Sequence, residues 1–380
     1  MNNDLTIIVP DYKSPFLKVI IEAALLLKPH KIVVSNYKTP LTEKIQKEII
    51  SETNIVFLNF DERKNPGDYR NEGVKNAYTK NLLFLDSDVR ININTIECIN
   101  SKLDTGLEEN IIYWGIYSEY GKSIFSKIQN KILRYRFSKK FFDRCLNKDK
   151  PYCGQSSHFL ITKNTFNKAG GFNPYLKIRE DNDFIVRSTE MGIKQSLDEK
   201  FEADHLKVYT LYSEYFQKPF HASKVKIEEP KIFNRPNAQI GLGLCLSWVL
   251  FPLFFVLSSI LFFSNLISID IYFFINVLSL ISSYTLLPKK ISDNLNLKEK
   301  IYIFLLLPLI GFNFLLGGTS GLIYGLILNL KGFMLYLIDY AKILFKVIYR
   351  NGNPIQIVNF ITSRCNLRCN HCFYKDTLDA

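Results

Sequence analysis

The sequence lacks the marks of a secreted protein. Its first ten residues, MNNDLTIIVP, carry an acidic residue and an apolar run that is too short for a secretory signal. The seven cysteines show no disulfide framework, because four are isolated along the chain and three gather near its end. We therefore expect residues 1–235 to stay in the cytoplasm.

Signatures of nucleic-acid binding are also missing, although the chain is basic, with a formal net charge of +12. The 48 Lys and Arg are scattered and flank apolar segments. No helix-turn-helix, zinc-finger or base-stacking signature accompanies them, so nucleic acid is not an expected partner. Disorder is excluded as well, since 30 Phe and 21 Tyr cannot be left in water.

Charge is absent from long stretches of the second half. Residues 240–263 carry none, and a run of 24 residues is long enough to cross a bilayer. Residues 271–287 are a second candidate, and the short connection between the two predicts a hairpin. Residues 301–330 are uncharged too, but Gly317, Gly318 and Gly321 interrupt them.

A transmembrane helical region is therefore expected over residues 236–348. Lysine-rich segments flank 301–330 and are expected in the cytoplasm, so this stretch must return to its starting side. It forms either a second hairpin, 301–316 with 320–338, or a segment that dips into the membrane. The expected location is the inner, cytoplasmic membrane, crossed several times, with residues 1–235 facing the cytoplasm. A buried core helix is the alternative for any one of these runs.

Strands and helices alternate along the first 90 residues. The apolar runs 5–10, 31–36 and 54–60 are typical of buried strands, and segments with helical spacing separate them. This alternation predicts an α/β fold with a mostly parallel, Rossmann-like sheet covered on both faces. Ligands bind beyond the carboxyl ends of such strands, where Asp11 and Asp86 are expected.

The acid pair Asp86-Ser87-Asp88 follows an apolar run. In extended backbone, positions i and i+2 point the same way, so both carboxylates can face one ligand. Two oxygen donors suit a hard divalent cation, which in turn neutralises a diphosphate. Taken alone, two aspartates beside a serine also fit an ordinary turn.

Further motifs stand in a fixed order around this pair. They are Pro10-Asp11-Tyr12, Arg70-Asn71 with Gly73, the pair Asp86 and Asp88, and Gly170-Gly171-Phe172 followed by Glu180-Asp181. In this order, residues 4–220 resemble the family 2 glycosyltransferases, which have the type-A nucleotide-sugar transferase fold. The resemblance implies a catalytic domain over residues 1–235 that moves a hexosyl group from a nucleotide-diphosphate sugar to an acceptor hydroxyl.

The resemblance also implies roles for single residues. Asp88 is expected to ligate Mg or Mn at the diphosphate, and Asp86 to contact ribose or metal. Asp181 is the expected general base, and Glu180 positions the acceptor or the base. His205 adds a metal or phosphate contact, or is a satisfied core histidine. The expected nucleotide-sugar contacts are Pro10, Tyr12, Arg70, Asn71 and Asp86.

Two departures from the family pattern bear on base recognition and on the number of sugars transferred. Val34-Ser35-Asn36 stands where members often carry an acid that holds the nucleotide base. The Gln-x-x-Arg-Trp element of processive synthases is missing after Asp181, which favours transfer of a single sugar. With a membrane region following, the expected acceptor is lipid-linked or membrane-proximal. The basic segment 218–235 is either a contact with anionic lipid or a simple linker.

Cys365, Cys369 and Cys372 form a second motif, with a spacing that suits three ligands of one 4Fe-4S cluster. With the preceding strand-like run, residues 354–380 resemble the start of a radical S-adenosylmethionine domain. Only eight residues follow Cys372, so we expect no radical chemistry from this chain alone. Two alternatives remain: a radical enzyme whose front domain is accessory, and a non-catalytic nucleotide-sugar-binding protein.

Overall fold

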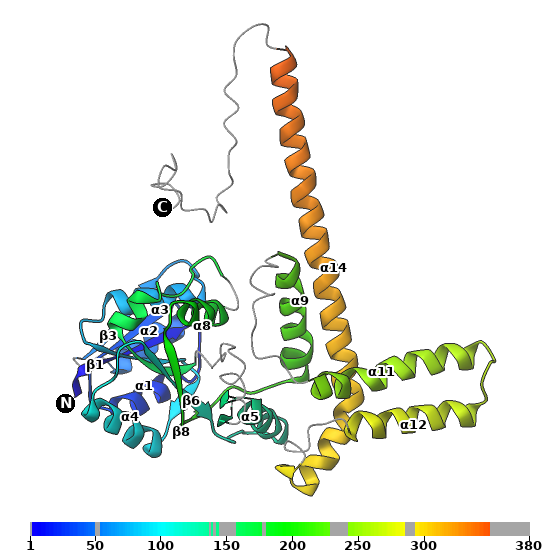
Figure 1. The fold of residues 1–380 in the computed structure, drawn as a ribbon, viewed down its shortest axis with the longest axis horizontal. Coiled ribbons are helices and arrows are strands. Elements are labelled where there is room, and N and C mark those ends of the chain that lie inside the picture. Colours follow the sequence, from blue (N-terminus) through cyan, green and yellow to red (C-terminus); the bar gives the residue numbers. More distant parts are fainter. Residues whose placement is uncertain are drawn as a thin grey trace. The chain divides into compact units, whose positions relative to one another are not determined.

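The computed structural model describes residues 2–49, 54–136, 138–139, 142–143, 157–176, 180–228, 242–285 and 293–349. The chain divides into two units, Met1–Leu326 and Ile327–Ala380. The first unit holds an eight-stranded sheet and most of the helices (Figure 1).

The strands of the sheet lie in the order β3-β2-β1-β4-β7-β6-β8-β5. Their bounds are β1 Asn2–Asp11, β2 Pro29–Tyr37, β3 Ile55–Phe60, β4 Asn81–Leu85, β5 Val89–Ile91, β6 Ile111–Tyr117, β7 His158–Thr162 and β8 Lys194–His205. Strands β3, β2, β1 and β4 run parallel, as does β8 beside β6. Strand β7 is antiparallel to both of its neighbours, and β5 is antiparallel to β8.

The expectation of a mostly parallel sheet is therefore wrong, because the sheet is mixed. The physical reason lies in β7, whose five residues HFLIT are all buried between β4 and β6. A strand buried on both faces reads as one continuous apolar run, whichever direction it takes. The sequence of β7 thus identifies a buried strand without giving its direction.

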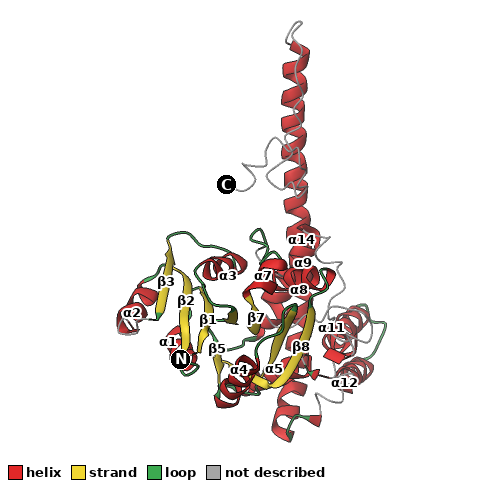
Figure 2. Cartoon of the chain, turned by 60° about the vertical axis from the view of Figure 1, so that its left-hand side comes forward, coloured by secondary structure: helices red, strands yellow, loops and turns green. Residues whose placement is uncertain are grey.

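Helices cover both faces of the sheet, as expected (Figure 2). Side chains alternate along β1, so Ile7 and Val9 enter one core while Ile8 enters the other. The first core also takes residues from α1 (Leu17–Leu25), α2 (Pro40–Ile49) and α4 (Ile93–Thr105). The second takes residues from α3 (Pro66–Lys75), α7 (Lys163–Lys168) and α8 (Glu180–Glu190).

The predicted first hairpin is present as two packed helices. Helix α11 (Leu242–Phe263) and helix α12 (Ile269–Thr285) lie side by side (Figure 1). Between them, Asn276 Nδ2 donates a hydrogen bond of 3.0 Å to Ser258 Oγ.

The predicted second hairpin is wrong, because a single helix, α14, runs from Leu297 to Tyr349. Each glycine inside a helix costs only about 1 kcal/mol, so Gly317, Gly318 and Gly321 do not end it. Within the described residues, the stretch Leu297–Leu328 is the one long and apolar enough to cross a membrane, and it contains an 18-residue window with a mean hydropathy of 2.1. The apolar helices Val249–Phe263 and Ile269–Thr285 are shorter.

Two of these glycines make room for the segment that follows β8. This segment contains a π-helix, η1 (Tyr212–Gln217), and the helix α9 (Lys218–Glu228). A Cβ atom on Gly317 would lie 2.3 Å from the carbonyl oxygen of Phe216, and one on Gly321 would lie 2.1 Å from that of Phe220. These glycines therefore allow the backbone of η1 and α9 to come close to α14, as small residues do where helices cross.

A third apolar cluster joins α5 (Ile124–Arg136) to the start of α14. Its buried members are Phe125, Ile128, Ile132, Tyr209, Tyr215, Leu295, Ile303, Leu307 and Ile310. Beside it, Lys131 Nζ lies 2.8 Å from Glu299 Oε2, and both side chains are largely buried. The base of α14 is thus packed against the same unit as the sheet.

Candidate active site

The acid pair lies in the turn that joins β4 to β5. The backbone N–H of Asp86 donates to Ser157 O at 2.8 Å, and that of Val89 donates to Asp86 O at 3.0 Å. The turn is also braced from the end of β1, where Asp11 Oδ1 accepts from Ser14 N at 3.1 Å and Ser14 Oγ donates to Ser87 O at 2.7 Å. Asp86 and Asp88 are therefore held at the carboxyl end of a central strand.

Arg70 connects this turn to helix α8. It projects from α3, is only 3% exposed, and donates from Nη2 to Asp86 Oδ1 at 2.8 Å and from Nη1 to Glu180 Oε1 at 2.9 Å. One buried guanidinium thus holds together two carboxylates that lie 94 positions apart in the chain. Asp181 follows Glu180 in the first turn of α8 and is half-buried.

Burial shifts the pKa values of Arg70, Asp86 and Glu180. Burial and the charge of Asp181 raise the pKa of Glu180 to about 7, although Arg70 opposes the shift. Burial also raises the pKa of Asp86 more than Arg70 lowers it. Burial by itself lowers the pKa of Arg70, but the two carboxylates outweigh this and keep the guanidinium charged. A single cation therefore serves two acids, the buried Glu180 and the half-buried Asp86.

Asn71 ties the Gly-Gly-Phe loop to helix α3. Its Oδ1 accepts from Phe172 N at 3.0 Å, and its Nδ2 donates to Phe172 O at 2.8 Å. Gly170 and Gly171 have φ of 77° and 66°, a region that favours glycine, so the loop needs both. The Asn71 amide is occupied by this loop, and its expected contact with a nucleotide sugar stays a prediction.

His205 ends β8 next to the second acid of the pair. Strands β5 and β8 pair Val89 with His205, which brings His205 Nε2 to 3.3 Å from Asp88 Oδ2. The other ring nitrogen, Nδ1, is hydrogen-bonded to the hydroxyl of Tyr209, and Tyr117 stacks on the imidazole with ring centroids 4.6 Å apart. Burial raises the pKa of Asp88, but the neighbouring His205 outweighs it, and the net shift is downward.

Pro10 and Tyr12 lie at the carboxyl end of β1. Pro10 pairs with Ser35 of β2, and the ring of Tyr12, 42% exposed, lies 5.7 Å from that of Tyr37. The guanidinium of Arg63 lies 4.2 Å from the centroid of the Tyr12 ring. An exposed aromatic face with a cation beside it thus occupies the strand end where the sequence predicts nucleotide-sugar contacts.

Sequence reasoning missed two residues of this arrangement, Tyr117 and Tyr209. Tyr117 ends β6 within an ordinary apolar strand, and nothing in its surroundings along the chain distinguishes it. Tyr209 stands four residues after His205, but no helix spans the two positions, so the spacing alone predicts no contact. Only the fold brings either tyrosine to the imidazole.

The fit of a divalent cation can be tested on the donor atoms. In the part of the chain that the structure describes, no group of three or more His, Cys, Asp or Glu side chains is placed to hold a metal ion. Asp88 and His205 supply one oxygen and one nitrogen donor beside each other, whereas Asp86 Oδ1 is paired with Arg70. These residues fit a cation that takes its remaining ligands from a diphosphate and water.

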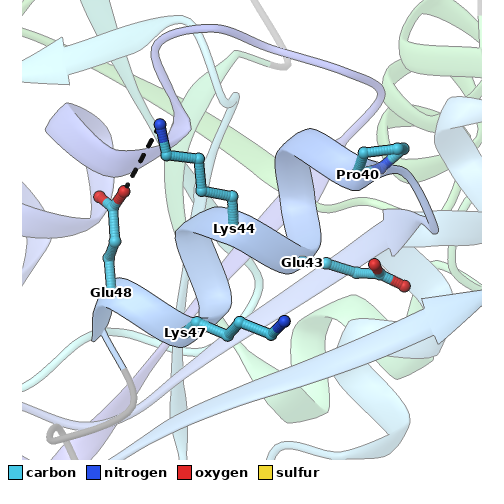
Figure 3. A pocket seen from close by; sticks show the side chains of 5 residues that line it. All are labelled: Pro40, Glu43, Lys44, Lys47 and Glu48. Carbon is cyan, nitrogen blue, oxygen red and sulfur yellow. Dashed lines mark ion pairs between the residues drawn. The ribbon is translucent and has the colours of Figure 1, made fainter.

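Two other features stand apart from this arrangement. Cys365, Cys369 and Cys372 lie outside the described residues, so the predicted iron–sulfur cluster and S-adenosylmethionine stay predictions. A surface hollow of about 350 Å³ lies along α2 (Figure 3) and is lined by Pro40, Glu43, Lys44, Lys47 and Glu48. A single helix lines this hollow, and no predicted site residue takes part.

Comparison with known proteins gives one family match and similarity to solved structures. Residues 21–200 match the protein-family model described as glycosyltransferase like family 2, whereas no curated protein matches the chain. The crystal structure of S. aureus TarS 1-349 is 16% identical, covers 83% of this chain and 90% of its own, and has a TM-score of 0.38. The mannosyltransferase PcManGT from Pyrobaculum calidifontis, in complex with GDP-Man and Mn²⁺, is 11% identical, with coverages of 86% and 87% and a TM-score of 0.47. Over residues 21–200, the chain is thus similar to glycosyltransferase like family 2.

Proposed function

We propose that this protein transfers one sugar from a nucleotide-diphosphate sugar to an acceptor hydroxyl. The observation that carries the proposal is the Arg70 bridge, which joins Asp86 of the acid turn to Glu180 at the start of α8. The bridge gives the nucleotide end of the sheet and the helix with the candidate base a fixed mutual position. The family match over residues 21–200 supports the same class of reaction.

Asp181 is the proposed general base. Glu180 is buried and paired with Arg70, so its carboxylate orients the helix start and is not available to take a proton from an acceptor. Asp181 adjoins it on the less buried side of the same turn. A carboxylate there takes the acceptor's proton as the acceptor oxygen attacks the anomeric carbon.

Asp88 and His205 are the proposed protein ligands of a divalent cation, Mg or Mn. When bound, such a cation neutralises the charge that builds on the departing diphosphate. The chain's own part is to present an oxygen and a nitrogen side by side, since Asp88 Oδ2 and His205 Nε2 are 3.3 Å apart. Asp86, held by Arg70, is left to contact the ribose.

We also propose that the helices after residue 240 lie in the cytoplasmic membrane and bring the domain to a lipid-linked or membrane-proximal acceptor. The hairpin of α11 and α12 has an apolar outer face and carries polar side chains in its interior. Phe274 is 67% exposed on its outer surface, whereas Ser283 is fully buried and Ser258 meets Asn276 between the helices. Serine and asparagine between helices whose outer faces are apolar are typical of a hairpin in lipid.

The test is a screen of nucleotide sugars with the 380-residue chain in detergent or membranes, with and without Mn²⁺. We expect hydrolysis or transfer with at least one donor, and loss of this turnover when the metal is chelated. Binding of a nucleotide sugar without metal-dependent turnover of any donor would support the rival, a non-catalytic binding protein.

A further inference from the structure

Tyr209 contacts His205 of the candidate metal site on the side of the ring away from Asp88. Its hydroxyl is hydrogen-bonded to His205 Nδ1, while His205 Nε2 faces Asp88. The two rings meet edge to face, with centroids 5.4 Å apart and an interplanar angle of 82°. The phenol thus contacts the nitrogen that points away from the acid pair.

The Tyr209 hydroxyl can donate to Nδ1 or accept from Nδ1–H, so the contact serves either tautomer of the His205 ring. A neutral imidazole carries one N–H, and the nitrogen without it is the one that binds a cation. When Nδ1–H donates to the Tyr209 oxygen, the lone pair of Nε2 points toward Asp88. Partners of this kind orient metal-binding histidines, and their loss typically weakens metal binding about 10- to 100-fold.

The ring of Tyr209 is itself fixed by the helices. It is 3% exposed and belongs to the apolar cluster that joins α5 to the start of α14. Its backbone N–H donates to Ser126 Oγ on α5 at 3.3 Å. The phenol therefore holds a set position relative to His205, as a residue that orients another must.

We propose that Tyr209 is a positioning residue: it holds the His205 ring in place and accepts its Nδ1–H when Nε2 and Asp88 together hold the divalent cation. The inference rests on the metal site of the proposed function and adds a residue that touches neither metal nor substrate. Tyr209 also connects the site to the base of α14, because its hydroxyl is bonded to His205 while its ring packs in the cluster that includes the start of α14.

The test compares Tyr209→Phe with Tyr215→Phe in the 380-residue chain. Both changes remove one hydroxyl from a buried ring of the same cluster, but the Tyr215 hydroxyl accepts from Gln129 Nε2 and has no part in the metal site. The probe is Mn²⁺ alone, followed by the loss of its free-ion electron paramagnetic resonance signal. Thermal unfolding is recorded for each variant.

We expect Tyr209→Phe to weaken Mn²⁺ binding about tenfold or more, and Tyr215→Phe to leave it unchanged. Wild-type affinity in Tyr209→Phe would overturn the inference while leaving the proposed metal site intact. Equal weakening in both variants would show a general effect on packing and would also overturn it. If the wild-type chain binds no Mn²⁺, the inference fails together with the metal part of the proposed function. A separate measurement of nucleotide-sugar binding then tests the donor part of that function.

Discussion

At the scale of single residues, Arg70 has the largest structural task. It is the one guanidinium that the described contacts place between the acid turn and helix α8. Removing one member of a buried ion pair leaves an uncompensated charge, which typically costs about 3–5 kcal/mol. Arg70 is therefore both a stability residue and a positioning residue.

Arg70→Met is expected to lower the free energy of unfolding by about 3–5 kcal/mol and to abolish turnover. The matched control is Arg90→Met, which removes the ion pair with Asp204 where the arginine side chain is 37% exposed. Exposed pairs contribute only about 0–1 kcal/mol. Thermal unfolding of the two variants measures the difference, and equal shifts would contradict the role given to Arg70.

At the residue scale, the short motifs could be read from the sequence, whereas the roles given to their residues stay predictions. The spacing of Asp86 and Asp88 and the pair Glu180-Asp181 indicated carboxylates, and the fold joins Asp86 to Glu180 through Arg70. The contact of Tyr209 with His205 was not predictable, because no helix spans the two positions. The contact of Tyr117 with His205 was not predictable either, because it depends on the pairing of β8 with β6. Strand register over such distances leaves no local sequence signal.

At the scale of elements, the glycines of α14 show that the same glycine pattern can mark either a helix break or a close contact between backbones. Gly317 and Gly321 favoured a break between two short helices, but they lie inside one helix and admit the backbone of η1 and α9. A glycine that allows close approach and a glycine that allows a turn look alike in a sequence. Only the element packed against it distinguishes the two.

Gly321→Ala is expected to destabilise the packing of α9 on α14 by about 1–3 kcal/mol, because the new methyl group would overlap the carbonyl of Phe220. Gly318→Ala is the control, since its Cβ would meet nothing closer than Ser223 Oγ at 3.7 Å. That substitution should leave stability unchanged or raise it slightly through helix propensity. Thermal unfolding in detergent compares them, and an unaltered Gly321→Ala midpoint would contradict this packing.

At the scale of the whole molecule, the continuous α14 alters the expected topology. The prediction that both lysine-rich flanks face the cytoplasm required residues 301–338 to return to their starting side. A single helix does not return, so if α14 crosses the bilayer, its two ends lie on opposite sides. The number of crossings therefore depends on whether α14 itself enters the membrane.

The membrane proposal predicts that the 380-residue chain stays with membranes after an alkaline carbonate wash. Replacing Phe273 and Phe274, both on the exposed face of α12, by Asp should release it, because each charge in lipid costs about 2.5–3.5 kcal/mol. Tyr78→Asp, at a still more exposed aromatic outside the hairpin, should leave retention unchanged. Release of the unaltered chain by the wash would contradict the proposal.

The central claim is that one catalytic centre is assembled from the acid turn and the start of α8. Its most direct test is Asp181→Asn against Glu190→Gln, a change at an exposed acid on the same helix. With a donor that the wild-type chain turns over, nucleotide-sugar binding and sugar transfer are measured separately. The account predicts that Asp181→Asn keeps donor binding and loses about 10²- to 10⁴-fold in transfer rate, while Glu190→Gln matches wild type. Wild-type transfer by Asp181→Asn would contradict it.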